Sequence, residues 1–247
     1  GGNELTVRED RSRTSLNLPG RQEELLKAVC ATGKPVVLVL LDGRASSINY
    51  AAAHVPAILH AWFPGEFCGQ AVAEALFGDY NPGGRLAVTF PKSVGQIPFA
   101  FPFKPGSDES SSTSVYGVLY PFGHGLSYTT FSYGDLKISP LRQGVQGDIN
   151  ISCKIKNTGK IKGDEVVQLY LRDEVSSVTT YTKVLRGFER ISLEAGEEQM
   201  VHFRLRPQDL GLWDKNMNFR VEPGKFKVMI GSSSTDIRLH GRFEIAP

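Results

Sequence analysis

The hydrophobic pattern of this chain changes its period partway along, and this change limits the possible folds more than any other feature. In the first part, segments with helical spacing alternate with short runs that are apolar throughout. From Phe131 onward, apolar and polar residues instead alternate one by one in short segments. The first pattern is typical of an α/β sheet with helical crossovers, and the second of strands with one face toward a core. We therefore predict two structural parts of different classes.

The first part, residues 1–91, predicts a partial open α/β sheet with helical crossovers. Each predicted helix ends at a glycine, Gly33 or Gly78, which is a common stop signal. The predicted strands are apolar on both faces, as expected when a sheet is covered on both sides. We expect the sheet to lack strands that came before residue 1. The predicted elements are helices over Arg21–Ala31 and Gly69–Phe77 and strands over Val36–Leu41, Ala57–Trp62 and Arg85–Phe90.

Residues 92–130 form a connecting segment that is rich in proline, glycine, serine and aromatic residues and has no clear period. A structureless loop of this length is uncommon unless it has a function or links two domains. Its aromatic side chains indicate packing against another surface rather than a free tether. These aromatic residues are Phe99, Phe101, Phe103, Tyr116, Tyr120 and Phe122.

Residues 131–247 predict an all-β sandwich. They contain about seven short segments of strand character with regular turn signals between them. No Cys…Trp…Cys spacing is present, so the likeness to immunoglobulin domains is one of architecture only. We predict that Trp213 fills the sandwich core and that His124 has a structural hydrogen-bonding role.

Composition narrows the classes of function. The net charge is +2 for 247 residues and no run of Lys or Arg is present, which argues against a nucleic-acid-binding protein. No apolar stretch approaches the ~20 residues of a membrane span, and no signal peptide is visible. No phosphate-binding glycine motif and no metal-ligand spacing occurs, so we expect neither a cofactor nor a metal. The cysteines, Cys30, Cys68 and Cys153, predict no disulfide framework.

Several longer motifs follow one another in a fixed order. In the first part and the connecting segment they are Asp10–Gln22 (DRSRTSLNLPGRQ), Gly33–Val37 (GKPVV), Ala61–Glu66 (AWFPGE), Gly78–Leu86 (GDYNPGGRL) and Tyr120–Phe131 (YPFGHGLSYTTF). In the last part they are Asn157–Gly159, Gly163–Tyr170 and Leu185–Phe188. Together they resemble the C-terminal part of family 3 glycoside hydrolases, and the resemblance runs over essentially the whole chain. It implies that residues 1–91 are the C-terminal half of the family's α/β domain and that the sandwich of residues 131–247 is fibronectin type III-like.

The resemblance implies a retaining, exo-acting β-glycosidase, with β-glucosidase as the first choice and β-xylosidase as the second. In this family the nucleophile is an Asp on an N-terminal (β/α)8 barrel, and the acid/base is a Glu on a loop of the α/β domain. The segment Ser107-Asp108-Glu109 does not match the Ser-Asp-Trp motif of the barrel. We therefore expect the nucleophile to be absent from this chain, which alone should be inactive. The chain starts without Met, so we expect it to be a fragment or a processed product.

The resemblance also points to an acid/base residue. In the family pattern a Glu often stands four residues before the Arg of the Asp-Arg pair, and counting back from Arg13 gives Glu9. The match departs from the pattern at Arg8, where Gly is usual, and at Ser12, where Asp is usual. Glu4 is therefore kept as the alternative to Glu9.

A different class of function stays open, in which the chain is a non-catalytic accessory module that binds a carbohydrate or a partner. An exposed row of aromatic side chains on the sandwich would favour this reading, but the alternation in Gly163–Leu171 supplies only Tyr170. For the enzyme, the expected partners are a β-linked oligosaccharide or glycoside and the barrel of the same protein. The resemblance to the family implies a periplasmic or secreted location. Assembly into a homo-oligomer is a further open alternative.

Overall fold

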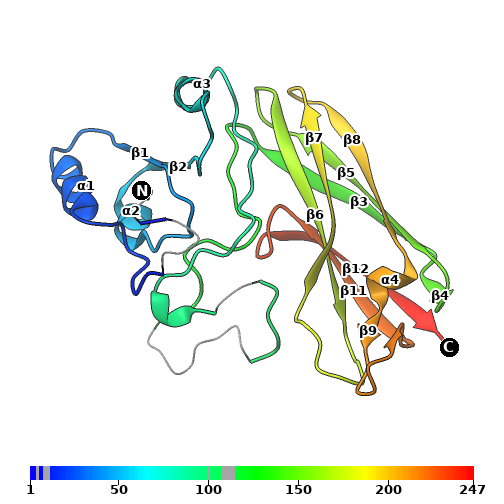
Figure 1. Cartoon of the computed structure of the whole chain (residues 1–247). Coiled ribbons are helices and arrows are strands. Elements are labelled where there is room, and N and C mark those ends of the chain that lie inside the picture. Colours follow the sequence, from blue (N-terminus) through cyan, green and yellow to red (C-terminus); the bar gives the residue numbers. More distant parts are fainter. Residues whose placement is uncertain (4–5, 8–11, 99–100, 107–114) are drawn as a thin grey trace. The chain divides into compact units, whose positions relative to one another are not determined.

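A computed structural model describes residues 1–3, 6–7, 12–98, 101–106 and 115–247 (Figure 1). The chain divides into two compact units, which are described one at a time below. The first unit contains residues 1–80, 88–100 and 109–121, and the second contains residues 81–87, 101–108 and 122–247. The two units therefore alternate along the chain between residues 81 and 122.

The first unit is built around a small parallel sheet. Its two strands pair in register from Val37 opposite Ala57 to Leu40 opposite His60, and helix α2 connects them. Helix α3 ends at Gly78, whose φ of +86° is the left-handed conformation that favours glycine at a helix C-terminus. The elements are α1 (Gln22–Cys30), β1 (Val37–Leu40), α2 (Asn49–His54), β2 (Ala57–His60), α3 (Cys68–Phe77) and a short 3-10 turn (Val94–Gln96).

The core of the first unit is modest in size. It joins α1, β1 and α2 to the segment that precedes α1, because each contributes apolar side chains to one cluster. Several other apolar side chains of the unit remain exposed, among them Leu25, Val37 and Phe77. The buried members of the cluster are Leu18, Leu26, Leu40, Ile48, Ala51 and Val55.

One predicted strand of the first part is wrong. Residues Arg85–Phe90 do not form a strand. Leu86 exchanges backbone hydrogen bonds with Gly123 and His124, whereas Phe90 forms an isolated antiparallel bridge with Tyr120. A bend separates these two pairings, and they belong to different units. The apolar pattern is that of a strand, but no continuous partner ladder exists for it.

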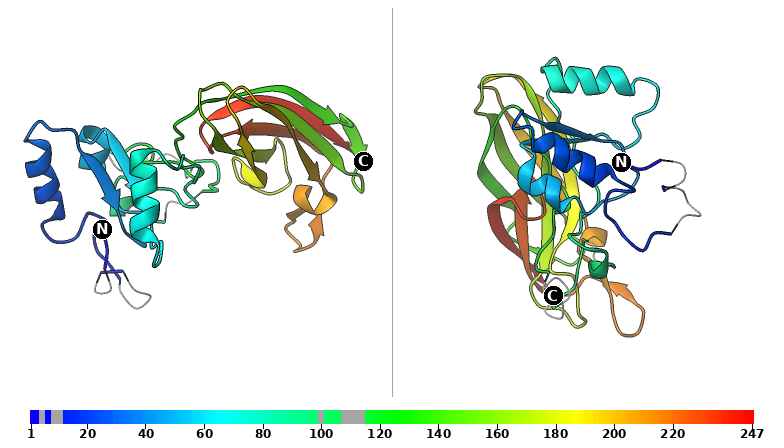
Figure 2. Two further views of the ribbon diagram at one scale, coloured as in Figure 1. Left: turned by 90° about the horizontal axis from the view of Figure 1, so that it is seen from above. Right: turned by 90° about the vertical axis from the view of Figure 1, so that its left-hand side faces the viewer.

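The second unit is a β-sandwich, as predicted (Figure 2). One sheet has five strands in the order β4-β12-β11-β6-β7, and the other has three in the order β3-β5-β8. A separate hairpin pairs β9 with β10. The strands are β3 (Phe131–Ser139), β4 (Arg142–Gly144), β5 (Ile149–Asn157), β6 (Gly163–Asp173), β7 (Val184–Leu193), β8 (Glu198–Leu205), β9 (Leu212–Trp213), β10 (Phe219–Arg220), β11 (Gly224–Gly231) and β12 (Ile237–Ala246), and the short helix α4 spans Pro207–Leu210.

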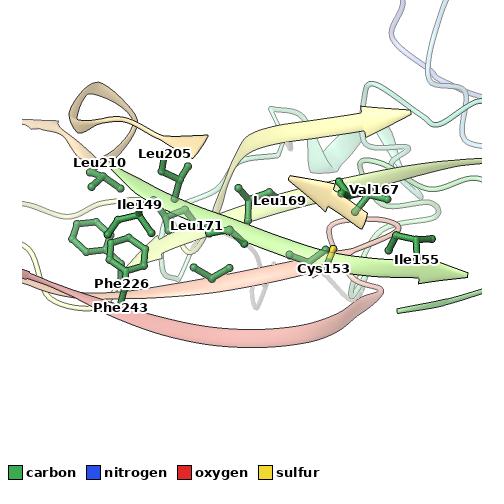
Figure 3. Packing of buried hydrophobic residues seen from close by; sticks show 14 of the residues in the cluster. Ile149, Cys153, Ile155, Val167, Leu169, Leu171, Leu205, Leu210, Phe226 and Phe243 are labelled. Atoms are coloured by element: carbon green, nitrogen blue, oxygen red, sulfur yellow. The ribbon is translucent and has the colours of Figure 1, made fainter. Parts of the chain in front are cut away.

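The sandwich core follows directly from the one-by-one alternation of apolar and polar residues. On β5, Ile149, Ile151, Cys153 and Ile155 are fully buried while the residues between them are more exposed. Their side chains meet those of the facing sheet, as the close view of this packing shows (Figure 3). From the other sheet the cluster includes Leu169 on β6, Phe226, Val228 and Ile230 on β11, and Phe243 and Ile245 on β12.

Trp213 does not fill the core, contrary to the prediction. Its side chain is 59% exposed and lies on the β9–β10 hairpin beside Phe219. The neighbouring core position is occupied by Leu210, at the end of helix α4, which is only 4% exposed. A tryptophan beside a leucine and a glycine suggested burial, but the hairpin directs the tryptophan away from the sheets.

The segment Asn81–Ala87 belongs to the second unit and is tied to it by polar contacts. The side chain of Asn81 accepts a hydrogen bond from the Tyr128 N–H and donates one to the Lys162 carbonyl. The guanidinium of Arg85 forms a buried ion pair with Glu165 of β6, with 2.8 Å between Nη2 and Oε1. Burial of both groups makes this pairing necessary, because an unpaired buried charge costs several kcal/mol.

Several aromatic residues of the connecting segment pack, as predicted, but Tyr116 is 64% exposed and Phe99 lies outside the described residues. In the second unit the ring of Phe101 stacks on Phe122, with 4.7 Å between centroids, and meets the buried Tyr170 edge-on. In the first unit Phe90 meets Tyr120 edge-on. These contacts hold parts of a segment that has little regular secondary structure. Within the described residues, no helix is both long and apolar enough to cross a lipid bilayer.

Candidate functional site

The carboxyl ends of β1 and β2 meet at one edge of the first unit because the two strands are parallel. Ligands of open α/β sheets bind at this edge, where the loops that follow the strands converge. At this edge the Ala61 N–H donates a hydrogen bond to the Leu40 carbonyl, with 2.9 Å between nitrogen and oxygen. Asp42 follows β1, and Trp62 follows β2.

The first residues of the chain are held against this edge. The Gly2 N–H donates to the Leu41 carbonyl at 2.9 Å, immediately after β1. The Val7 N–H donates to the Asn3 carbonyl at 2.8 Å, and Thr6 lies in a turn. A methyl group on Gly2 would lie 2.0 Å from Cγ2 of Val7, closer than carbon atoms can approach. The turn therefore requires glycine at this position.

Gly43 completes this first anchor. A methyl group on Gly43 would lie 2.7 Å from Cγ1 of Val7 and 2.6 Å from the ring of Phe63. The backbone after β1 is thus enclosed between a side chain of the N-terminal turn and a side chain of the loop after β2. Three segments that are distant in sequence converge on one glycine, and this contact fixes the position of Val7.

A second anchor lies on the C-terminal side of the same segment. The Leu16 carbonyl accepts a hydrogen bond from the Ser47 N–H at 2.9 Å, and the side chains of Leu16 and Leu18 are buried. The guanidinium of Arg13 donates to the Asn17 carbonyl at 2.6 Å. These contacts hold the chain against the loop that follows β1, as it enters helix α1.

The two candidate acid/base residues, Glu4 and Glu9, lie outside the residues that the structure describes. The described residues on both sides of each are those of the two anchors. Asn3 and Thr6 are the described residues nearest to Glu4, and Val7 and Ser12 those nearest to Glu9. The structure therefore brings the two ends of the segment that contains both glutamates to the carboxyl edge of the sheet.

Asp42 is a fully buried carboxylate at this edge. Its Oδ2 accepts a hydrogen bond from the Ser46 hydroxyl at 2.5 Å. Its Oδ1 has no hydrogen-bond partner among the described residues and lies 2.7 Å from where a methyl group on Gly2 would be. A buried carboxylate oxygen is normally hydrogen-bonded, so this atom marks a polar position beside the N-terminal segment.

His60 ends β2 in an aromatic environment. Its ring lies 4.3 Å from that of Trp62 and 5.3 Å from that of Phe90, measured between centroids. Burial disfavours the charged imidazolium and lowers the pKa of His60, and the nearby Asp42 opposes this shift only in part. The ring is therefore neutral at neutral pH. Trp62 has a φ of +54°, a rare conformation for a large side chain.

The sequence analysis singled out the segment that contains Glu4 and Glu9, but it did not single out Asp42 or His60, which lie at the same edge of the sheet. Both are polar residues at the end of an apolar run, and this position in a parallel sheet is a usable signal. Trp62 packs against His60 and Phe90, in keeping with the packing role that its sequence context indicates. Among the described residues, no three His, Cys, Asp or Glu side chains come close enough to hold a metal ion. The segment Ser107-Asp108-Glu109 lies outside the described residues.

Comparison with known proteins adds to this geometry. Residues 1–128 match the Glycosyl hydrolase family 3 C-terminal domain, and residues 165–234 match a fibronectin type III-like domain. These two matched domains, in this order, define the C-terminal portion of a glycoside hydrolase. This chain belongs to glycoside hydrolase family 3.

Among curated relatives, the chain is 44% identical to a β-xylosidase of Formosa agariphila over 95% of its own length, which is 33% of that protein. It is 40% identical to a periplasmic β-glucosidase of Salmonella typhimurium over 99% of its length and 33% of that protein. The chain thus spans about a third of the length of the curated relatives it matches.

Solved structures agree with these matches. A β-glucosidase from Erythrobacter marinus superimposes with a TM-score of 0.94 at 41% identity, covering 100% of this chain and 34% of that one. A β-glucosidase from Listeria innocua in complex with glucose superimposes with a TM-score of 0.89 at 32% identity, covering 96% of this chain and 34% of that one.

Proposed function

We propose that this chain is the acid/base-bearing part of a retaining, exo-acting β-glycosidase, and that Glu9 is the acid/base. The nucleophile is an Asp of the (β/α)8 barrel that family membership implies elsewhere in the parent protein. Glu4 is the alternative acid/base. The proposal is made for the parent protein, and this chain alone is expected to be inactive because a retaining glycosidase needs both carboxyl groups.

The observation that carries this proposal is the pair of anchors at the carboxyl edge of β1 and β2. The contacts of Gly2 with Leu41 and of Leu16 with Ser47 hold both ends of the segment that contains Glu4 and Glu9. A carboxyl group that must approach a substrate on another domain needs such a support, since small displacements of a catalytic group lower the rate strongly.

The chemistry follows in two steps. First the protonated carboxyl of Glu9 gives its proton to the glycosidic oxygen while the Asp carboxylate attacks the anomeric carbon. The bond from the anomeric carbon to this oxygen breaks, and the aglycone leaves as an alcohol. In the second step the Glu9 carboxylate takes a proton from water, whose oxygen attacks the anomeric carbon and releases the Asp carboxylate. Closure of the site must raise the pKa of Glu9, because the first step needs the acid form.

The proposed substrate is a terminal, non-reducing β-linked glucosyl residue. The Salmonella typhimurium and Listeria innocua relatives, both β-glucosidases, favour this choice. A terminal β-xylosyl residue is the second candidate, favoured by the identity of 44% with the Formosa agariphila β-xylosidase. For location, we infer export of the parent protein to the periplasm or outside the cell, in line with the periplasmic relative.

The test is Glu9→Gln in the full-length parent, assayed on aryl β-glucosides with poor and good leaving groups. We expect kcat/KM on a poor leaving group to fall by about 10²–10⁴-fold, because general acid catalysis contributes that much. Turnover of a dinitrophenyl glucoside, which needs no protonation to leave, should be largely retained in its first step. The basic limb of the pH profile should also disappear, since it reports the acid form of this residue.

Glu4→Gln is the matched control, because it removes the same charge from the same segment. It should leave the leaving-group dependence of the parent unchanged. If Glu4→Gln shows the leaving-group dependence and Glu9→Gln does not, the acid/base is Glu4. If neither shows it, the role of the whole segment is refuted.

A further inference from the structure

The β9–β10 hairpin presents large apolar side chains to solvent. Trp213 is 59% exposed, Phe219 46% and Met217 72%. Both views of Figure 2 show this part of the chain, with the short helix α4, projecting from the sandwich. Single exposed apolar residues are common on protein surfaces, but a cluster that includes a tryptophan marks an interaction site more often.

The hairpin is held in one conformation by a buried carboxylate. Asp214 is 4% exposed, and its Oδ1 accepts the N–H groups of Asn216 at 2.8 Å and of Asn218 at 3.0 Å. Its Oδ2 accepts the Nε of Arg220 at 2.8 Å. The Asp214 N–H donates in turn to the Asn218 carbonyl. One side chain thus fixes the turn that separates the two exposed rings.

The two rings are fixed as well. Their centroids are 5.5 Å apart at an interplanar angle of 60°. The ring of Phe219 lies against the backbone of Gly211, where a methyl group would come within 2.3 Å of it. The part of the chain that projects from the sandwich begins with helix α4, whose Leu210 is buried in the sandwich core. Binding to such a surface loses little conformational entropy, because the rings are already ordered.

Polar side chains surround the rings. Lys215, Asn216, Asn218 and Arg220 are all exposed and offer ammonium, amide and guanidinium donors. An apolar partner would have to desolvate these groups without pairing them, which costs free energy. A ligand that combines an apolar face with many hydroxyl groups would instead satisfy both kinds of surface.

We propose that this hairpin is a glycan-binding site for a β-linked pyranose chain, with Trp213 as its aromatic platform. The CH face of a pyranose is apolar and matches the face of an indole ring, while the donors around it bind ring hydroxyls. Such a site holds a polysaccharide without cleaving it, so the inference goes beyond the glycosidase activity proposed above. It also supplies the exposed aromatic surface that the sequence did not reveal on Gly163–Leu171.

The test measures binding of the 247-residue chain to soluble barley β-glucan by affinity electrophoresis and to xylohexaose by calorimetry. We expect Trp213→Ala to weaken binding by about tenfold or more, since one well-stacked aromatic ring contributes on this scale. A ligand-induced change in tryptophan emission should be present in the wild type and absent in this variant. Trp213→Phe should keep part of the affinity.

Phe188→Ala is the matched control. Phe188 is 65% exposed on β7 of the same sandwich, so its removal changes exposed aromatic surface without touching the hairpin. It should leave the affinity unchanged. Asp214→Ala should weaken binding by loosening the turn, while thermal unfolding of the chain reports whether either variant has lost its fold.

Three outcomes would overturn the glycan site. The wild-type chain could fail to bind either probe at millimolar concentration. Trp213→Ala could bind as well as the wild type, in this chain or in the full-length parent. Lastly, the substitution could change only the sedimentation of the chain, in which case the hairpin joins two copies. None of these measurements depends on cleavage, so failure here and failure of Glu9 as acid/base are distinguishable.

Discussion

The two units differ in how completely they bury their own apolar residues. In the sandwich, alternation directs one face of each sheet into a shared core, and Ile149, Ile155 and Leu169 are fully buried. In the first unit, β1 is apolar on both faces, yet Val37 is 51% exposed and only Leu40 is fully buried. A two-stranded sheet is marginal by itself, and parallel sheets are normally covered on both faces.

This difference shows that the two hydrophobic patterns have different consequences. The alternation in the sandwich strands leaves a polar outer face, whereas the continuous apolar run of β1 leaves apolar side chains exposed. In a strand with period two, apolar residues lie on one face and polar residues on the other. The outer faces of the sandwich therefore need no further protein to cover them. An apolar run carries no such division, and it requires protein on both sides. Because the relatives are about three times longer than this chain, we expect protein outside it to cover the first unit.

A pair of leucine truncations tests this comparison most strongly. Leu169→Ala in the sandwich should lower its free energy of unfolding by up to about 5 kcal/mol, because a rigid core leaves a cavity. Leu40→Ala in the first unit should cost nearer to about 2 kcal/mol, because a small core can collapse around the gap. Urea unfolding followed by hydrogen exchange would assign each loss to its unit. If both substitutions unfold the same residues at the same urea concentration, the units are not independent and the comparison fails.

The ion pair between Arg85 and Glu165 tests which unit the segment Asn81–Ala87 stabilises. Arg85→Ala leaves a buried carboxylate without its partner and should destabilise the sandwich by about 3 kcal/mol. This loss of stability is at the lower end of the range for breaking a buried ion pair, because the Val166 N–H still donates a hydrogen bond to Glu165. The double variant Arg85→Met with Glu165→Leu is the control and should recover most of the stability. A loss confined to the first unit would refute the assignment of this segment.

Substitution of Asp173 should produce the smallest of these changes in stability, and the change should depend on pH. Burial raises the pKa of this carboxyl from 3.8 to about 6, and the nearby Glu222 adds to the shift. The folded state therefore holds the proton more tightly than the unfolded state, so stability decreases as pH rises from about 4 to about 6.

Asp173→Asn should remove this dependence. Since the side chain is half exposed, we expect a discounted gain of about 1 kcal/mol at pH 7 and no gain at pH 4. Thermal unfolding of both proteins across this range checks the result. An equal gain at both pH values would show that charge is not the cause.

Much of the fold could be predicted from the sequence because hydrophobic period is a local property. Helix α1 was expected at Arg21–Ala31 and is found at Gln22–Cys30, and the sandwich was expected from its alternation. The strand expected at Arg85–Phe90 is wrong because strand pairing needs a partner, which no local pattern supplies. Trp213 is exposed for a similar reason, since the direction of a hairpin is set by the strands around it.

The candidate site could be predicted only in part. The motif around Arg13 predicts an acid/base residue in this segment, and both Glu9 and Glu4 remain predictions because they lie outside the described residues. The position of Asp42 at the end of an apolar run is a usable signal for the edge of the sheet, but its burial could not be predicted, because this burial depends on Gly2 and Val7 lying over the end of β1. Residues that act through such contacts between distant segments carry little signal in a single sequence.

The alternation of the two units along the chain has a consequence for exchanging parts between relatives. A chimera that joined the sandwich of another family member at Phe131 would separate Glu165 from its own Arg85, and Gly123 from its own Gln168. A graft of the sandwich must therefore carry residues 81–87 and 101–108 with it, as three inserted pieces rather than one. Recombination of this protein, natural or engineered, is constrained by a boundary that no single crossover point can follow.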